Sequence, residues 1–273
     1  MQLSKNNKIF YIEGFQFPLD CAPTRMIADD KSAQSELMKK NNIDCFQHYF
    51  FNPYELDIND IYKLFDIYKK IVIKQNNGGT GGKNIFLVTN KKQISLIIKM
   101  FVEREMFVSV SPYYSYEIEY RMIVLKGKIE LCYEKHRPFI IGDGKTCIEK
   151  LTLKKYGKSL IIDSNINKNT ILKKNEKIIL IWTHNLKTGA EPVVINDQQT
   201  INKFKDQVSK ITKLFNINFC SIDFAIINNI PHVVEINGGV MMEKFSSTSD
   251  KNYIISKNIY KKALSLVFGT KMK

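Results

Sequence analysis

The chain has 273 residues, with 41 lysines and arginines against 27 aspartates and glutamates, which gives a formal net charge of +14 at pH 7. This length allows one large domain or two tightly packed lobes. No apolar run is long enough to span a bilayer, and the first residues lack the apolar stretch of a signal peptide, so we expect neither a membrane protein nor a secreted one.

The five cysteines of the chain indicate a reducing compartment. They are scattered, odd in number and never spaced as Cys-x-x-Cys. Such cysteines are typical of free thiols, most of them in the core. We therefore expect the protein in the cytoplasm.

The positive charge is spread along the chain and does not predict a nucleic-acid binder. Only four of the basic residues are arginines, and lysine, isoleucine and asparagine are used heavily throughout, which indicates a coding bias towards A and T. Aromatic residues are not interleaved with basic ones, as a platform for stacked bases requires. We expect no nucleic-acid partner, although a positive surface would attract ATP or an acidic substrate.

Apolar spacing predicts alternating strands and helices in the first half of the chain. Ile61, Leu64 and Phe65, for example, recur at helical spacing. The predicted elements are a strand at Lys8–Ile12, helices at Ser32–Asn41 and Asn59–Lys70, strands at Ile71–Lys74 and Ile85–Thr89, a helix capped by Asn90 and Gln93, and a strand at Phe107–Val110.

The second half adds hairpins to further helices. We predict a hairpin of Tyr120–Leu125 with Ile129–Tyr133, a short helix begun by a capping box of Thr146 and Glu149, a buried strand at Ile178–Trp182, a helix capped by Asp197, and a last helix from Ser249 or Asp250 to Gly269. This mixture of hairpins and helices predicts an α+β fold.

A glycine-rich loop separates the strands at Ile71–Lys74 and Ile85–Thr89. Four glycines fall within the five positions 78–82. Such a loop turns sharply and lays backbone N–H groups against an anion. No Gly-Lys-Ser/Thr opens a helix after it, so it is not a Walker loop. The alternatives are a phosphate cradle and a merely flexible hairpin tip.

A second hairpin, Ser221–Ile227 with His232–Asn237, carries the strongest chemical signal. If Ile227 pairs with Pro231, Asp223 lies opposite Glu235, and Asn237 shares their face. The residues then expected in the core are Ile222, Phe224, Val234 and Ile236.

Two carboxylates directly across a strand pair repel each other, and a hairpin does not need them there. A bound cation would remove the penalty. Because the three donors are all oxygens, they suit a hard ion such as magnesium, which leaves positions open for water and phosphates. The alternative is a hairpin with ordinary solvated acids.

Seven motifs in this order resemble those of the ATP-grasp superfamily, in particular the carboxylate-amine ligases of the cyanophycin synthetase and D-alanine-D-alanine ligase type. The likeness runs from about Ile27 to Gly239. The motifs are Asp30-Lys31, Val72-Ile73-Lys74, the glycine loop, Glu119-Tyr120-Arg121, His136-Arg137-Pro138 with Gly142-Asp143-Gly144-Lys145, Asn185-Leu186 with Gly189, and the trio Asp223, Glu235 and Asn237.

The resemblance implies an ATP-grasp fold in which two α+β lobes clasp the nucleotide. Residues 1–30 would be a short N-terminal segment, 31–110 a small lobe with the lid, and 111–273 a large lobe with the metal-binding hairpin. Such ligases usually carry a whole domain before the first lysine, and only 30 residues precede Lys31 here. A second subunit in a homodimer, another partner or a bulky substrate would then supply the missing wall.

The resemblance also assigns roles to residues. Arg137 would meet the transferring phosphoryl group, and Asn185 would contact the same phosphates. Asp223, Glu235 and Asn237 would hold two Mg²⁺ ions, with Mn²⁺ as a substitute. The expected ATP-binding residues are Lys31, Lys74, Gly78, Gly79, Thr80, Gly81, Gly82, Ser111, Tyr113 and Glu119.

The implied activity is an ATP-dependent ligase that forms an amide or peptide bond through an acyl phosphate. Its substrates would be small molecules or peptides. The alternatives are a peptide-modifying enzyme or macrocyclase, and a non-catalytic nucleotide-binding module. Taken singly, Lys31 and Lys74 are ordinary surface lysines, Glu119 is an acid paired with Arg121, and His184 is the histidine most open to a functional role.

Overall fold

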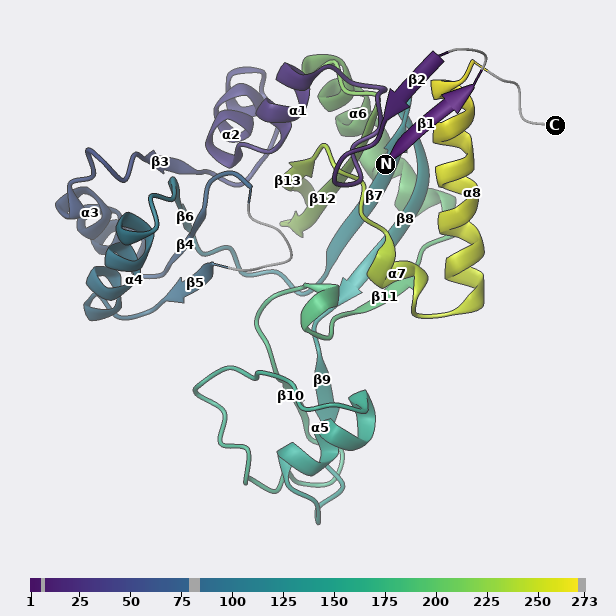
Figure 1. Ribbon diagram of the computed structural model, residues 1–273. Helices are drawn as coiled ribbons and strands as arrows, with labels where there is room; N and C mark the ends of the chain where they lie inside the picture. Colours follow the sequence, from purple (N-terminus) through teal and green to yellow (C-terminus); the bar gives the residue numbers. More distant parts are fainter. Residues whose placement is uncertain (6–7, 79–83, 270–273) are drawn as a thin grey trace.

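The computed structural model describes residues 1–5, 8–78 and 84–269. Figure 1 shows a small lobe, a large lobe and a projecting lobe that hangs below them. The small lobe contains a four-stranded sheet, and the large lobe is built on a five-stranded sheet. The part of the chain that is described contains no helix long and apolar enough to cross a membrane.

The large lobe is built on an antiparallel sheet in the order β11-β8-β7-β12-β13. Its strands are β7 (Glu119–Leu125), β8 (Lys128–His136), β11 (Glu191–Val194), β12 (Phe219–Ile227) and β13 (Ile230–Asn237).

Each face of this sheet is covered by its own elements. Met122 and Val124 pack under α1 (Ala22–Ala28), α2 (Lys31–Lys40) and α6 (Gln198–Leu214). Ile123 and Leu125 point to the opposite face, because successive side chains of a strand alternate. That face is covered by β1 (Gln2–Lys5), β2 (Lys8–Tyr11), α7 (Glu243–Ser246) and α8 (Asp250–Val267).

The second of these faces changes from apolar to charged along the strands. Ile123, Tyr133 and Phe219 lie in the core. The residues two positions towards the small lobe share their face. They are Arg121, Lys135 and Ser221.

The small lobe contains an antiparallel sheet in the order β3-β6-β4-β5. Ile71 and Ile73 pack in the lobe's core, whereas Val72 and Lys74 point to the other face. The elements of this lobe are β3 (Tyr49–Phe51), α3 (Ile58–Tyr68), β4 (Ile71–Gln75), β5 (Ile85–Val88), α4 (Lys92–Glu103) and β6 (Val108–Pro112).

Two details of this region differ from the sequence prediction. Ser111 and Pro112 continue β6, although the sequence predicts that this strand ends at Val110. Helix α2, expected in the small lobe, packs Met38 into the core of the large sheet. Asp30 caps the N-terminus of α2, a role that the sequence analysis did not assign to it. Its carboxylate accepts a hydrogen bond from Ala33 N at 2.8 Å and fixes the start of the helix.

The projecting lobe comprises β9 (Phe139–Ile141), α5 (Ile148–Tyr156) and β10 (Lys177–Ile179), and it has a core of its own. The predicted capping box of Thr146 and Glu149 is wrong. The N-cap is Cys147, and Thr146 instead binds Asp143, which also accepts from the Lys145 backbone. An Asx turn at Asp143 therefore takes the Thr146 backbone N–H that the box would have used, and Lys168 O accepts from the backbone N–H of Glu149.

A methyl group at Gly142 is expected to destabilise the projecting lobe. A Cβ there would overlap Lys173 O and lie 2.5 Å from Leu172 Cβ. We expect Gly142→Ala to cost about 1–3 kcal/mol and to speed proteolysis within residues 139–181. Ser159→Ala, at an exposed position of the same lobe, is the control. Equal cleavage rates for the two variants would contradict the prediction.

The hairpin of β12 and β13 forms with a register that the sequence predicts only in part. Asp223 does pair with Glu235, but the strands close at Ile227 and Ile230 over Asn228 and Asn229. Both asparagines have positive φ, as a two-residue hairpin turn requires.

With the strands closed at Ile227 and Ile230, regular pairing would place Asp223 opposite Val234. A register shift between Asp223 and Phe224 places Asp223 opposite Glu235 instead. It also changes which valine is buried. Phe224 pairs with Val233, which is fully buried, whereas Val234 faces the cavity described below. The prediction of Val234 in the core was therefore wrong, while Ile222, Phe224 and Ile236 are buried as expected.

Candidate functional site

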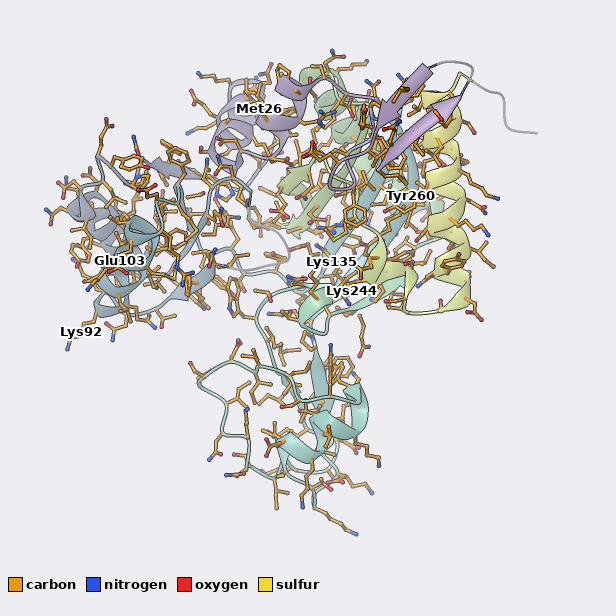
Figure 2. The ribbon with its side chains drawn as sticks, viewed as in Figure 1. Met26, Lys92, Glu103, Lys135, Lys244 and Tyr260 are labelled. Atoms are coloured by element: carbon orange, nitrogen blue, oxygen red, sulfur yellow. The ribbon has the colours of Figure 1, made fainter. Side chains whose placement is uncertain are left out.

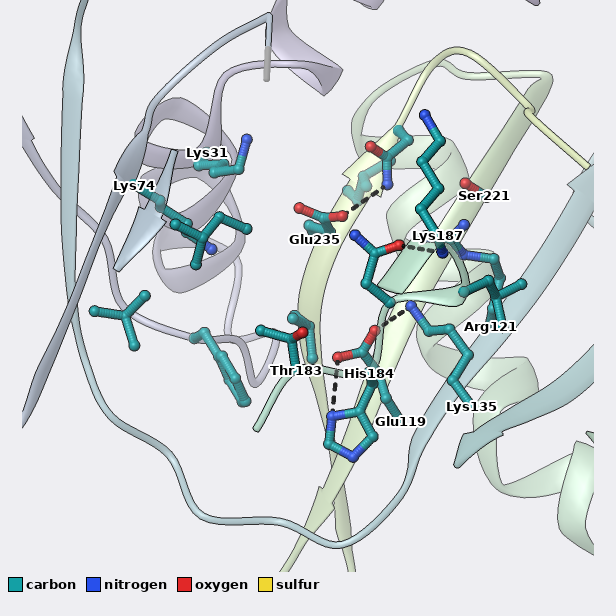
Figure 3. A pocket seen from close by; sticks show the side chains of 18 of the residues that line it. Lys31, Lys74, Glu119, Arg121, Lys135, Thr183, His184, Lys187, Ser221 and Glu235 are labelled. Atoms are coloured by element: carbon teal, nitrogen blue, oxygen red, sulfur yellow. Dashed lines mark hydrogen bonds and ion pairs between the residues drawn. The ribbon is translucent and has the colours of Figure 1, made fainter. Parts of the chain in front are cut away.

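A cavity of about 360 Å³ lies between the sheets of the large lobe and the small lobe (Figure 3). It brings together ten of the predicted site residues from both lobes. Asp223 is buried behind its wall. Gly79, Thr80, Gly81 and Gly82 lie outside the described residues. The predicted residues that line the cavity are Lys31, Lys74, Gly78, Ser111, Tyr113, Glu119, Arg137, Asn185, Glu235 and Asn237.

Basic side chains outnumber carboxylates around this cavity. Figure 2 shows two of them, Lys135 and Lys244, near the junction of the three lobes. An excess of fixed positive charge in a concave site favours a polyanion such as a triphosphate. The lining cations are Lys31, Lys74, Arg121, Lys135, Arg137, Lys187 and Lys244, and the lining carboxylates are Asp29, Glu119 and Glu235.

Lys31 and Lys74 stand together on one wall, as Figure 3 shows. Lys31 Nζ donates to Asn76 O at 3.3 Å, which ties the start of α2 to the end of β4. Lys74 is 8% exposed, and its burial lowers its pKa to about 8 against the opposing effect of Glu235. Lys74 is therefore mostly charged at neutral pH.

Glu235 and Asn237 project from β13 into the cavity, two residues apart on one face. Asn237 Nδ2 donates to Glu235 Oε1 at 3.3 Å. Burial alone would raise the pKa of Glu235, but Lys31 and Lys74 outweigh it and the pKa is lowered. The two side chains thus offer an ionised carboxylate and an amide oxygen side by side.

Asp223 is held by two cations that the sequence analysis did not assign to the site. Arg121 Nε donates to Asp223 Oδ1 at 2.7 Å, and Lys135 Nζ donates to Oδ2 at 3.0 Å. Burial opposes ionisation, yet Arg121 and Lys135 lower the pKa of Asp223 to about 2. Glu119, expected to pair with Arg121 if it had no role in binding, pairs with Lys135 instead.

Arg137 has the clearest unfilled hydrogen-bonding group in the cavity wall. Its Nε is buried, and no atom of the described residues accepts from it. A buried donor without an acceptor is costly, and a bound anion would supply one. This observation fits the expected role of Arg137 towards a phosphoryl group.

His184 and three aromatic rings shape the side of the cavity next to the projecting lobe. The His184 ring stacks on Tyr116 at 4.8 Å, and its Nε2 lies 2.9 Å from Glu117 O. Burial lowers its pKa, so the ring is neutral at neutral pH. Tyr113 meets Trp182 edge to face at 6.2 Å, which provides an apolar wall for a flat ring.

Comparisons with known proteins agree with this geometry. No family model matches the chain. A curated relative, the glutathione biosynthesis bifunctional protein GshAB of Clostridium perfringens (strain 13 / Type A), is 22% identical over 272 residues, which cover 90% of this chain and 34% of the relative.

Among solved structures, D-alanine–D-alanine ligase from Bacillus anthracis matches with a TM-score of 0.58 and 15% identity over 89% of this chain and 67% of that one. A bifunctional glutathione synthetase from Pasteurella multocida matches with a TM-score of 0.53 and 18% identity over 89% of this chain and 37% of that one. The ATP-grasp ligase PsnB, complexed with a minimal precursor, matches with a TM-score of 0.52 and 11% identity over 85% and 58%.

The chain has the ATP-grasp fold. The fold class expected from the sequence is thereby confirmed. The chain spans about a third of the length of the GshAB relative and of the Pasteurella protein.

Within this ATP-grasp fold, the chain's own first 30 residues form part of the wall that the sequence analysis left open. Gln16 Nε2 donates to Asp29 Oδ2, and Gly238 N donates to Asp29 Oδ1, both at 3.2 Å. A Cβ at Gly239 would lie 3.0 Å from Gly14 O, so the backbones approach closely there. The N-terminal segment is thus fastened to the loop that follows Asn237.

The residues present fit a magnesium ion. No group of three His, Cys, Asp or Glu side chains that could hold a metal occurs in the described part of the chain. A metal in the cavity would therefore take few protein ligands and complete its shell with phosphate and water oxygens, as Mg²⁺ does. Glu235 and Asn237 are suitable ligands of this kind, whereas both carboxylate oxygens of Asp223 already accept from protein cations.

Proposed function

We propose that the protein is an ATP-dependent carboxylate-amine ligase that forms an amide or peptide bond through an acyl phosphate. The observation that carries the proposal is the basic cavity between the two ATP-grasp sheets. Glu235, hydrogen-bonded to Asn237, lies on one wall, and Lys31 and Lys74 lie on the other. The names of the similar structures, which include a D-alanine–D-alanine ligase and a glutathione synthetase, support the reaction class.

The proposed reaction needs positioned charge more than covalent chemistry from the protein. Phosphoryl transfer is catalysed mainly by orientation and by neutralising the phosphate oxygens. Lys31 and Lys74 would contact the phosphates as point charges, and Arg137 would present its unpaired Nε to the transferring group. Glu235 and Asn237 would hold a Mg²⁺ ion, which would supply positive charge next to the phosphates.

The amine would attack the carbonyl carbon of the acyl phosphate, forming the C–N bond as the C–O bond to phosphate breaks. Water must be kept from this intermediate, since it would hydrolyse it. Tyr113 and Trp182 would cover the nucleotide's base, and the N-terminal segment at Gly14 and Gln16 would close the opposite end.

The proposal is tested by ADP release in the presence of ATP, Mg²⁺ and a panel of carboxylates and amines. Hydroxylamine in place of the amine should trap an acyl phosphate as a hydroxamate. We expect both products for the correct carboxylate. Failure of ATP to bind, measured as the absence of a thermal shift in the folded protein, would overturn the proposal.

A peptide substrate is the second candidate, within the same reaction class. PsnB was solved with a minimal precursor, and a ligase from Chryseobacterium gregarium was solved with ADP and a leader and core peptide, with a TM-score of 0.51 and 12% identity to this chain. Peptides bearing Asp, Glu or Lys side chains therefore belong in the panel. Loss of one water from such a peptide would identify a macrocyclase.

ATP affinity is expected to fall as the pH rises through the pKa of Lys74. Because that pKa is lowered to about 8, Lys74 loses its charge above this value, and the affinity should fall by up to about tenfold per pH unit. The measurement is a titration with ATP between neutral and alkaline pH. Adenosine, which has no phosphates, is the control and should bind with unchanged affinity; a parallel loss would contradict the role of Lys74.

The site of action that we propose is the cytoplasm. All five cysteines are free thiols in the structure. Cys132 and Cys220 are buried, and burial raises the pKa of Cys132 to about 12. Thiols of this kind suit a reducing compartment.

A further inference from the structure

Both oxygens of the Asp223 carboxylate accept hydrogen bonds from protein cations. Arg121 donates two hydrogen bonds to it, from Nε to Oδ1 at 2.7 Å and from Nη2 to Oδ2 at 2.5 Å. Lys135 Nζ adds a third contact to Oδ2 at 3.0 Å. The Asp223 side chain is 1% exposed and that of Lys135 is 5% exposed, so water does not compete for these contacts.

Lys135 joins this pair to a second carboxylate. Its Nζ also forms an ion pair with Glu119, which accepts a hydrogen bond from the Tyr116 hydroxyl at 2.8 Å. Arg121, Lys135, Asp223 and Glu119 therefore form a network of two cations and two anions on β7, β8 and β12. Buried charges persist when they are paired and hydrogen-bonded in this way.

This network conflicts with the expectation of two metal ions. A second ion bridging Asp223 and Glu235 would need lone pairs that now accept from Arg121 and Lys135. Taking Asp223 from them would leave Arg121, whose side chain is 20% exposed, without its carboxylate partner, and would leave Lys135 with Glu119 alone, which is unfavourable. Within the described residues, the Glu235 carboxylate has no such engagement and accepts one hydrogen bond, from Asn237 Nδ2.

We propose that Arg121 and Lys135 stand in for a second metal ion beside Asp223, so that the nucleotide binds with a single Mg²⁺ held by Glu235 and Asn237. The inference rests on the proposed nucleotide binding. Arg121 and Lys135 both line the cavity. Their positive charge is thus built into the sheet, where an ion would otherwise have to be bound with each substrate.

The number of bound ions tests the proposal directly. Mn²⁺ replaces Mg²⁺ as a paramagnetic probe, and a non-hydrolysable ATP analogue keeps the site filled. Counting Mn²⁺ by electron paramagnetic resonance at saturating analogue should give a single ion per bound nucleotide. Two ions per nucleotide would overturn the proposal, whereas failure of the analogue to bind would overturn the proposed function itself.

Two matched variants assign the ion to its ligands. In the presence of the analogue, Glu235→Gln should weaken Mn²⁺ binding by about tenfold or more. Asp223→Asn, in protein that circular dichroism shows to be folded, should weaken it much less. An equal loss in both variants would make Asp223 a metal ligand and refute the inference. If Asp223→Asn does not fold, the count on the unaltered protein decides the question alone.

Discussion

Replacing Glu235 by glutamine is expected to lower ATP turnover by about 100-fold or more. Glutamine keeps the shape of the side chain but removes the negative charge that Lys31 and Lys74 stabilise in the folded protein. The variant therefore resembles a permanently protonated Glu235. Of the two side chains that we assign to the Mg²⁺ ion, Glu235 and Asn237, only Glu235 is charged. The ion that accompanies the nucleotide therefore loses its one charged protein ligand in this variant.

The measurement is steady-state ADP release with the substrates found in the panel, at Mg²⁺ concentrations that saturate the unaltered protein. Glu55→Gln, at an exposed position of the small lobe, is the matched control and should retain full turnover. Raising Mg²⁺ should restore part of the activity of Glu235→Gln. Turnover equal to that of the control would show that Glu235 has no part in the reaction.

The residue pattern of the late hairpin predicts which side chains of β12 and β13 lie together. Asp223 pairs with Glu235 as expected, although a register shift beside Phe224 and not strict alternation from the turn produces this pairing, and Asn237 follows two residues after Glu235. The cavity also contains Lys31, Lys74 and Arg137, which the resemblance to ATP-grasp motifs singles out. In each case, a motif of a few adjacent residues carries the information.

The bulge beside Phe224 shows where a local rule fails. A strict period of two places Val234 in the core, but a register shift changes the period once, and Val233 is buried in its place. Nothing in the composition of the hairpin marks this shift. The prediction of a capping box at Thr146 fails because the two N–H groups that the box needs donate elsewhere, that of Thr146 to Asp143 and that of Glu149 to Lys168 O.

The role of Lys135 could not be predicted, because it depends on strand pairing at long range. Arg121 lies opposite Asp223 only because β7 pairs with β12, and Lys135 lies opposite Glu119 only because β7 also pairs with β8. In a chain with so many lysines, a single buried one has no sequence signal. Its importance follows from its 4% exposure and its two carboxylate partners.

Lys135→Met should therefore lower the free energy of unfolding by about 3 kcal/mol. Methionine fills a similar volume, so the effect comes from charge: Asp223 keeps Arg121, but Glu119 loses its ionic partner in the interior. Urea denaturation measures the change as a lower midpoint with an unchanged slope. Lys128→Met, at an exposed position on the same strand, controls for the loss of a lysine and should leave the midpoint in place.

When the pH is lowered, Lys135→Met should also unfold at a higher pH than the unaltered protein. The pKa of Asp223 is lowered from 3.8 to about 2 in the folded protein, so its contacts stabilise the fold above the ordinary value, and this stabilisation is lost as the pH falls towards 2. Removing Lys135 raises the folded-state pKa of Asp223, which narrows the pH range over which ionised Asp223 stabilises the folded protein. If the acid transition and the urea midpoint both match those of Lys128→Met, Arg121 alone neutralises Asp223, and Lys135 contributes nothing to the charge balance of the site.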